Sequence, residues 1–233
     1  MMNELLEIKN LVKYYGNILA VNDISFSLKK GEIVGLLGPN GCGKSTTMKA
    51  ICGAIKGYNG DVLFYGNPLG IQSKSCISYL PEKTYLSDWM KPKYIIEYLS
   101  DFFTDFDCEK AKEMLQKFNI SLNMPLKRMS KGMREKTELI MTISRKAELY
   151  VLDEPLSGID PVSRESLLDI IFNHYTKESS ILLSTHQIND IERIMGRIIM
   201  MGQGKILVDD TVKNIESQGE TVSSLFREVF AYV

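Results

Sequence analysis

The sequence has little of what marks several large classes of protein. It holds 28 Lys and Arg against 29 Asp and Glu, so it lacks the excess positive charge with which proteins bind nucleic acid. No uninterrupted apolar run reaches the roughly 18 residues of a membrane-spanning helix. The 4 cysteines are scattered and form no CxxC pair, which argues against a zinc site and a disulfide framework. We therefore expect no nucleic-acid partner, no membrane span in this chain, and reduced thiols.

The composition that is present belongs to an ordinary globular protein. The 233 residues, 44% hydrophobic and 24% charged, are enough for one substantial core and argue against disorder. No linker rich in Pro, Gly or Ser and no internal repeat divides the chain, so a single domain over residues 1–233 is predicted. The first residues lack the basic region, apolar stretch and cleavage site of a secretory signal, which favours the cytoplasmic side of the membrane.

The pattern of apolar residues predicts an α/β fold. Short β-rich runs fill the first third of the chain, at 5–8, 24–28, 33–37 and 62–65. From about 90 to 145 the apolar residues recur at three-and-four spacing, which predicts helices. Beyond that, apolar strands at 149–152 and 181–183 alternate with helical segments. This alternation is typical of a parallel sheet covered on both faces.

A glycine-rich loop follows one of these strands. Residues 38–45, Gly-Pro-Asn-Gly-Cys-Gly-Lys-Ser, fit the pattern G-x-x-x-x-G-K-[ST] between the apolar run 33–37 and a helix-like segment at 46–52. The glycines let backbone N–H groups turn toward one point, where the positive end of the following helix also attracts phosphate. Lys44 adds a charge and Ser45 a hydroxyl for Mg²⁺. The residues predicted to hold the nucleotide here are Gly38, Pro39, Asn40, Gly41, Cys42, Gly43, Lys44, Ser45 and Thr46.

Two adjacent acids end the apolar strand at 149–153. Asp153 at the strand tip can hold Mg²⁺, directly or through water. Glu154 points to the other side and can polarise a water for attack on the γ-phosphate. Exposed acid pairs are common, so a strand that merely ends in solvated acids stays an open alternative for these two residues taken alone.

One of the 2 histidines follows a strand that ends near the same place. His186 comes directly after the strand at 181–183, whereas His174 lies within a helical segment and on no motif, and is read as a surface or core residue. Three strands, ending after Leu37, Leu152 and Leu183, bring functional groups to the carboxyl edge of a parallel sheet, where such folds bind ligands. We therefore predict a functional role for His186.

The order of these motifs resembles that in the ATP-binding subunit of an ATP-binding cassette (ABC) transporter, over nearly the whole chain. The resemblance implies a phosphate-loop (RecA-like) ATPase core with an N-terminal antiparallel β-subdomain and a helical subdomain at about 83–146. It also implies hydrolysis of MgATP to ADP and phosphate. The segments that carry it are Tyr15, the phosphate loop, Tyr79-Leu-Pro-Glu82, Met129-Ser-Lys-Gly-Met133, Leu149 to Pro155, Ser157-Gly-Ile-Asp160 and His186.

The same resemblance implies roles for residues outside the phosphate loop. Tyr15 stands where the family stacks an aromatic ring on adenine. Ser130 and Gly132 stand where the family has its LSGGQ signature, at the start of a helix expected near Arg134, and would contact the γ-phosphate of a partner subunit's ATP. By the same resemblance, Asp160 is predicted to be one of the residues that bind the nucleotide. Two ATP molecules would then lie between two cassettes, of the same or of different sequence.

Two departures from the family pattern change charge. The first Gly of the signature is replaced by Lys131, and its Gln by Met133. Where the family usually has Gln, this chain has Glu82, whose carboxylate can accept from water or approach Mg²⁺ and takes part in the predicted catalytic and metal sites. Glu82 together with a Ser-Lys-Gly-Met signature is similar to ATPases of export systems of the ABC-2 type, and we predict export on this ground.

A separate transmembrane permease subunit is the partner that this interpretation requires. The chain would bind it at the inner face of the cell membrane, as a peripheral subunit. Trp89 and the aromatic residues between Asp101 and Asp107 are expected to belong to the core rather than to a socket for a permease helix. The main rival is a soluble ABC-type ATPase that acts on ribosomes or nucleic acid. A nucleotide kinase would leave the elements at 130–132 and 157–160 without a role.

Overall fold

The computed structural model describes residues 4–157, 159, 161–174, 178–186, 188 and 192–231. Its strands are β1 (Glu4–Tyr15), β2 (Ile18–Lys29), β3 (Ile33–Leu37), β4 (Asn59–Phe64), β5 (Asn67–Pro68), β6 (Ile77–Leu80), β7 (Leu149–Asp153), β8 (Ser180–Thr185), β9 (Arg197–Gly202) and β10 (Lys205–Thr211). Its helices are α1 (Lys44–Ile51), α2 (Ile71–Ser75), α3 (Pro92–Phe102), α4 (Cys108–Lys117), α5 (Lys131–Ile143), α6 (Pro161–His174), α7 (Val212–Ser217) and α8 (Val222–Phe230), with 3-10 turns at Leu126–Arg128 and Glu192–Ile194. The predicted α/β class is confirmed.

The larger sheet carries the strands whose ends matter for function. Its order is β10-β9-β3-β8-β7-β6, and only β10 runs antiparallel to its neighbour among these described strands. Every residue of β3, β7 and β8 is buried, as expected of parallel strands covered on both faces. Because these strands are parallel neighbours, the segments that follow Leu37, Asp153 and Thr185 begin at the same edge of the sheet.

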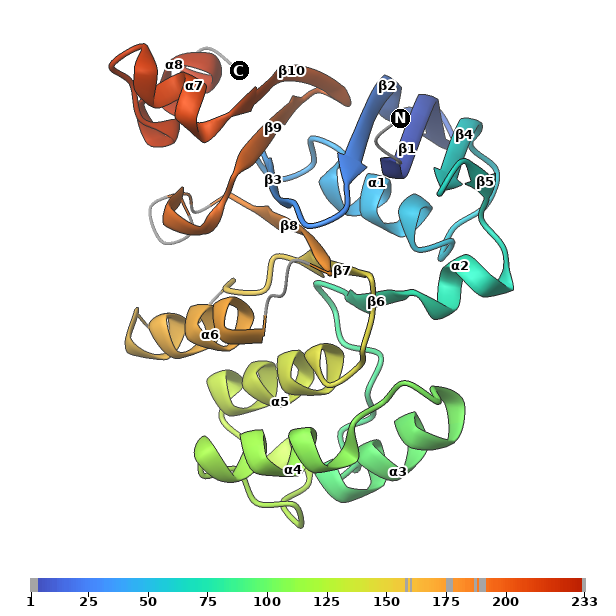
Figure 1. Ribbon diagram of the computed structural model, residues 1–233, viewed down its shortest axis with the longest axis vertical. Helices are drawn as coiled ribbons and strands as arrows, with labels where there is room; N and C mark the ends of the chain where they lie inside the picture. Colours follow the sequence, from blue (N-terminus) through green and yellow to red (C-terminus); the bar gives the residue numbers. More distant parts are fainter. Residues whose placement is uncertain are drawn as a thin grey trace.

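The smaller sheet is antiparallel, in the order β2-β1-β4-β5, and α1 lies between it and the larger sheet (Figure 1). β1 and β2 each run for 12 residues, so the short runs predicted at 5–8 and 24–28 underestimate them. The pairing continues across a bulge, where Asn10 and Asp23 have positive φ and the Asn10 amide donates to Asp23 at 3.0 Å. Polar residues at the bulge interrupt the alternation that marks a strand.

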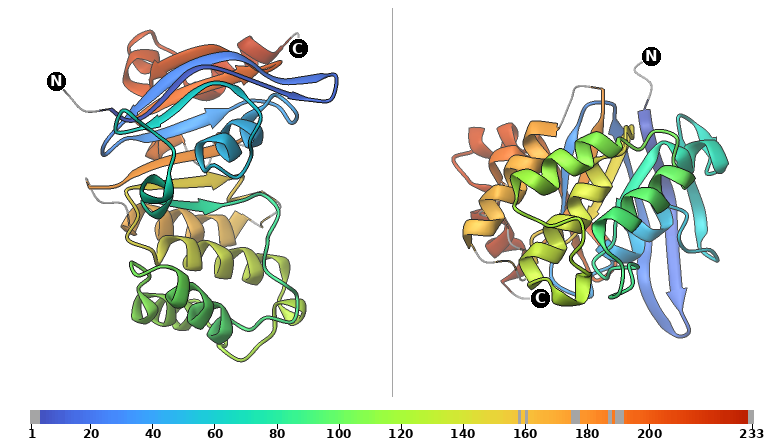
Figure 2. Two further views of the ribbon diagram at one scale, coloured as in Figure 1. Left: turned by 90° about the vertical axis from the view of Figure 1, so that its right-hand side faces the viewer. Right: turned by 90° about the horizontal axis from the view of Figure 1, so that it is seen from below.

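Helices α3, α4 and α5 form the end of the molecule away from the smaller sheet (Figures 1 and 2). α5 begins at Lys131, earlier than the start expected near Arg134, because the Ser130 hydroxyl accepts from the Met133 N–H at 3.2 Å and caps the helix. No helix of the described ranges is both long and apolar enough to span a bilayer.

Some aromatic residues expected in the core lie on the surface instead. Phe106 is buried, but the side chains of Trp89 and Phe102 are 65% and 67% exposed. For Phe102 the reason is that the apolar residues of α3 extend over two adjacent sides of the helix. Ile95 and Leu99 face the core, while the neighbouring side carries three exposed aromatic residues at four-residue spacing, Tyr94, Tyr98 and Phe102.

Arg145 joins the helical end to the larger sheet. Its buried guanidinium donates to both carboxylate oxygens of Asp105, at 3.2 and 3.1 Å, and to the Ile77 carbonyl of β6 at 2.6 Å. It also donates to the Ser75 carbonyl and lies 3.9 Å from the centroid of the Phe103 ring. A buried guanidinium with all these partners holds the loop after α3 against the start of β6.

We expect Arg145→Met to lower the free energy of unfolding by about 3 kcal/mol, because it leaves Asp105 and the backbone acceptors without their donor. Urea denaturation followed by circular dichroism measures this. Arg227→Met, which removes an exposed guanidinium from α8, is the control and should change stability by less than about 0.5 kcal/mol. Equal effects of the two substitutions would contradict a stabilising role for Arg145.

Candidate nucleotide-binding site

The loop between β3 and α1 has a backbone that requires glycine. Gly38, Gly41 and Gly43 have φ of 152°, 81° and 109°. A Cβ at Gly43 would lie 2.6 Å from the Ala20 carbonyl oxygen, and one at Gly38 would lie 2.2 Å from that of Met201. The loop therefore packs against neighbouring backbone and leads directly into α1, whose first N–H groups have no partner within the helix.

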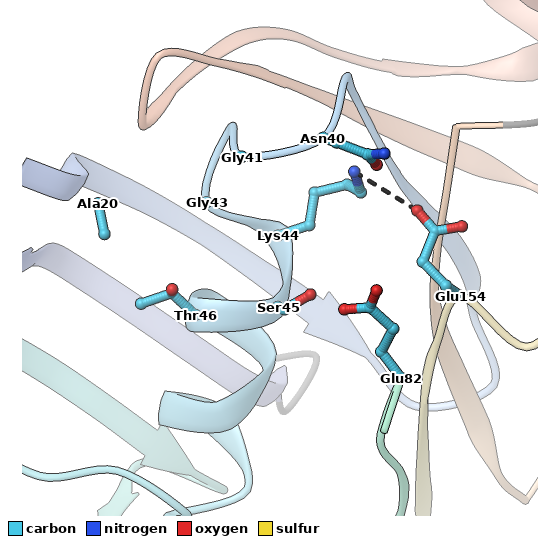
Figure 3. Close-up of a pocket in the computed structure, with 9 residues that line it drawn as sticks. All are labelled: Ala20, Asn40, Gly41, Gly43, Lys44, Ser45, Thr46, Glu82 and Glu154. Carbon is cyan, nitrogen blue, oxygen red and sulfur yellow. Dashed lines mark ion pairs between the residues drawn. The ribbon is translucent and has the colours of Figure 1, made fainter. Parts of the chain in front are cut away.

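A cavity of about 290 Å³ opens beside this loop. Figure 3 shows the loop and the start of α1 on one side, with the carboxylates of Glu82 and Glu154 facing them from the other. The structure thus brings together the phosphate loop and two of the acids predicted from the sequence. The residues that line the cavity are Ala20, Asn40, Gly41, Gly43, Lys44, Ser45, Thr46, Glu82 and Glu154.

Lys44 is buried and its ammonium is held inside the loop. Its Nζ donates to the carbonyl oxygens of Gly38 at 2.7 Å and Pro39 at 3.1 Å, and lies 3.5 Å from Glu154 Oε1 (Figure 3). A cation fixed at this point, beside the open N–H groups of a helix start, is suited to binding phosphate oxygens.

Asp153 is 1% exposed and is held by two hydroxyl groups. Its Oδ1 accepts from Ser45 Oγ at 3.0 Å and from Ser184 Oγ at 2.6 Å, whereas its buried Oδ2 has no hydrogen-bond partner among the described residues. Burial raises the pKa of Asp153, and the hydrogen bonds from Ser184 and Ser45 oppose that change. A buried carboxylate oxygen without a partner, next to a serine hydroxyl, fits the oxygen ligands that Mg²⁺ takes.

Glu154 lies between the lysine and the predicted histidine. Its Oε2 is 3.0 Å from His186 Nδ1, and its backbone N–H donates to Ser184 Oγ at 2.9 Å. The φ of Glu154 is 51°, which is rare for a residue other than glycine and turns its side chain away from the path of the strand. The arrangement gives one carboxylate a cation on one side and an imidazole on the other.

Of the residues outside the phosphate loop that are predicted to bind nucleotide, the three described ones lie away from the cavity. Tyr15 ends β1, is 46% exposed, and has Lys13 Nζ 5.0 Å from its ring centroid, but it does not line the cavity. Ser130 and Gly132 lie at the start of α5, also outside the lining. Asp160 lies outside the described residues.

Sequence reasoning missed Ser184. Its hydroxyl donates to Asp153 and accepts from the Glu154 N–H, so it joins two neighbouring site residues. The sequence signal was a serine directly after the apolar run Ile181 to Leu183, because a hydroxyl buried in a strand needs hydrogen-bond partners. Ala20, from β2, also lines the cavity and carried no signal.

Comparison with known proteins gives a consistent result. A family model described as ABC transporter matches residues 21–157. The chain is similar to an uncharacterized ABC transporter ATP-binding protein, MJ1023, of Methanocaldococcus jannaschii, with 33% identity over 92% of this chain and 80% of the relative. It is 30% identical to the SkfA peptide export ATP-binding protein SkfE of Bacillus subtilis, over 96% of each. A solved ATP-binding subunit of an ABC transporter superposes with a TM-score of 0.85 and 27% identity, over 96% of this chain and 98% of that one.

Replacing the buried acid should separate stability from binding. We expect Asp153→Asn to raise the free energy of unfolding by about 1 kcal/mol near pH 7, because the amide carries no charge to desolvate and its oxygen can still accept from Ser45 and Ser184. The folded-state pKa of Asp153 is raised, so its ionisation costs stability as the pH rises through that pKa. The gain should therefore shrink as the pH falls toward about 4.

The same variant should lose at least about tenfold in Mg²⁺-dependent ATP affinity if Asp153 is the metal ligand that the sequence predicts. Urea denaturation and calorimetric ATP titrations with and without Mg²⁺ measure the two effects. Asp61→Asn, at an exposed position of β4, is the control. Unchanged Mg²⁺-dependent affinity in Asp153→Asn would reject the metal-ligand role.

Proposed function

Because the chain belongs to the family of ABC transporter ATP-binding proteins, we propose that it is the MgATP-hydrolysing subunit of a membrane exporter. One observation carries the hydrolytic part of this proposal. The buried carboxylate of Glu154 lies between Lys44 and His186, at the wall of the cavity beside the phosphate loop. We propose residues 1–233 as one ATPase domain of this family.

The geometry supports a division of roles at the cavity. The loop N–H groups and the Lys44 ammonium bind the phosphates, while Ser45 and Asp153 hold Mg²⁺, with Glu82 at the same wall. When bound, Mg²⁺ supplies positive charge at the phosphate oxygens. Glu154 orients a water and accepts its proton as the water oxygen bonds to the γ-phosphorus and the bond to the bridging oxygen breaks, giving ADP and phosphate. His186 holds Glu154 in place at 3.0 Å.

A second ATPase subunit is part of the proposal. Ser130 and Gly132 lie at the exposed start of α5 and do not line this chain's own cavity. Because the start of a helix favours anionic groups, we assign these residues to contact with a nucleotide bound by a second cassette. ATP would then close the two subunits on each other, and hydrolysis would release them. Tyr15 would stack on adenine, and Asp160 would belong to the nucleotide-binding set.

Export is the direction that the relatives favour. The name of SkfE describes peptide export, and this chain aligns with it over nearly the full length of both. The permease partner would receive the chain at the inner face of the membrane, and the closing and opening of the subunits would drive its transport cycle.

The exposed aromatic stripe on α3 is the surface we assign to that permease. Tyr98 and Phe102 have ring centroids 4.8 Å apart, and the acids Glu97 and Asp101 are exposed beside them. Lys91 and Lys93 lie over the Tyr94 ring at the other end of the stripe. Cytoplasmic segments of membrane proteins carry an excess of Lys and Arg, so the acid-flanked end at Tyr98 and Phe102 is complementary to such a segment in both charge and polarity.

Removing the carboxylate of Glu154 tests its proposed chemical role. Glu154→Gln should retain ATP binding while turnover falls by roughly 10², because an amide is a poor proton acceptor. Binding without turnover should also accumulate the ATP-closed dimer, which sedimentation velocity detects. Lys44→Ala should instead lose affinity for ATP, since it removes the ammonium held within the loop. Ordinary turnover in Glu154→Gln would reject the assigned role.

Polar substitutions in the α3 stripe test its assignment to the permease. The pair Tyr98→Ser and Phe102→Ser should lower the membrane-bound share of the chain several-fold in its native host and leave the ATPase rate of the purified subunit unchanged. Phe172→Ser removes an equally exposed aromatic residue from α6 and is the control. Fractionation measures the share, and a photocrosslinker at position 98 identifies the partner. Crosslinks to ribosomal proteins instead of an integral membrane protein would favour the rival function.

A further inference from the structure

A second cavity, of about 190 Å³, shares a wall with the first. Glu82 and Glu154 line both cavities, so each side chain separates the phosphate loop from the space next to α5. Lys131, the first residue of α5, also lines the second cavity. The described residues that line it are Leu80, Pro81, Glu82, Lys131, Glu135, Glu138, Asp153, Glu154, Pro155 and Ser157.

The charges around this second cavity are unbalanced. Five of its lining residues are acids and Lys131 is the single cation among the described ones. Neighbouring cations are already engaged, because Arg134 pairs with Glu138 and Asp88, and Lys44 pairs with Glu154. Burial raises the pKa of Glu135 to about 7, Lys131 opposes that change, and the charge of Glu138 adds a smaller rise.

Lys131 is placed to act on more than one of these acids. Its side chain is 66% exposed, and its Nζ lies 3.9 Å from Glu135 Oε1, a loose ion pair that keeps the ammonium at the cavity. Ser130 caps α5 immediately before it, which fixes the backbone from which the side chain extends. Across the cavity, the carboxylate of Glu82 points toward Ser45 and the phosphate loop (Figure 3).

We propose that Lys131 is a positioning residue for Glu82, whose carboxylate it draws toward the second cavity when a triphosphate occupies the first. The two residues carry opposite charges and line the same cavity. An ionised Glu82 beside the phosphate loop repels a triphosphate, and attraction to Lys131 favours the position of the carboxylate in which that repulsion is smaller. The start of α5 is thereby coupled electrostatically to the nucleotide site of its own chain. This inference rests on the proposed binding of ATP.

A double-mutant cycle on ATP affinity tests the proposal. ATP is titrated calorimetrically in EDTA, where no metal screens the phosphates and no turnover occurs. We expect Lys131→Met to weaken binding about fivefold in the wild-type background and to have no effect in Glu82→Gln. Lys131→Arg keeps the charge and should bind like the wild type. Lys213→Met, which removes an exposed lysine from α7, is the matched control and should not change affinity.

The salt dependence of ATP affinity is a second measurement, and a purely structural role of Lys131 would not change it. The fivefold difference should shrink when salt is raised from about 50 mM to about 500 mM, because screening weakens the interaction between Lys131 and Glu82. Equal losses on Lys131→Met in both Glu82 backgrounds would overturn the proposal and assign Lys131 to direct phosphate binding or to folding. Failure of every variant, and of the wild type, to bind ATP even with Mg²⁺ would instead overturn the proposed function.

Discussion

The pairing register of three parallel strands sets the position of every group at the candidate site. Leu37 of β3 pairs with Thr185 of β8, and Asp153 of β7 pairs with Ser184. Because side chains alternate between the faces of a sheet, a slip of one residue would move Asp153 to the opposite face and part it from Ser45 and Ser184. The burial of all three strands opposes such a slip, since it would also carry their apolar side chains out of register.

The site holds its groups in arrangements that a purely stable protein would avoid. Asp153 is a carboxylate buried with one oxygen unpaired, and Glu154 has a backbone conformation that favours glycine. Lys44 satisfies its charge with loop carbonyls and with Glu154, whose other oxygen meets His186. Each of these arrangements lowers the stability of the fold locally. The apolar core that covers both faces of the larger sheet compensates for that loss.

The sequence alone was sufficient for the parts of the fold that depend on local patterns. The phosphate loop, the acids after β7 and the histidine after β8 each follow an apolar strand, and parallel strands bring such ends together. Ser184 could not be assigned, because its role depends on which residue of β7 lies opposite, a non-local fact. The exposure of Phe102 could not be predicted either, since the apolar residues of α3 extend over two adjacent sides of the helix and periodicity does not say which side is covered.

The aromatic face of α3 also has a consequence for how the chain is made in the cell. Tyr94, Tyr98 and Phe102 form a contiguous row on one helix, and Trp89 is exposed in the segment before it. Water-exposed aromatic rows of this kind promote self-association when nothing covers them. Chains synthesised in excess of their covering partner would therefore aggregate first through this face. If the proposed permease covers this face, balanced synthesis of the two proteins would limit that self-association without any change in the fold.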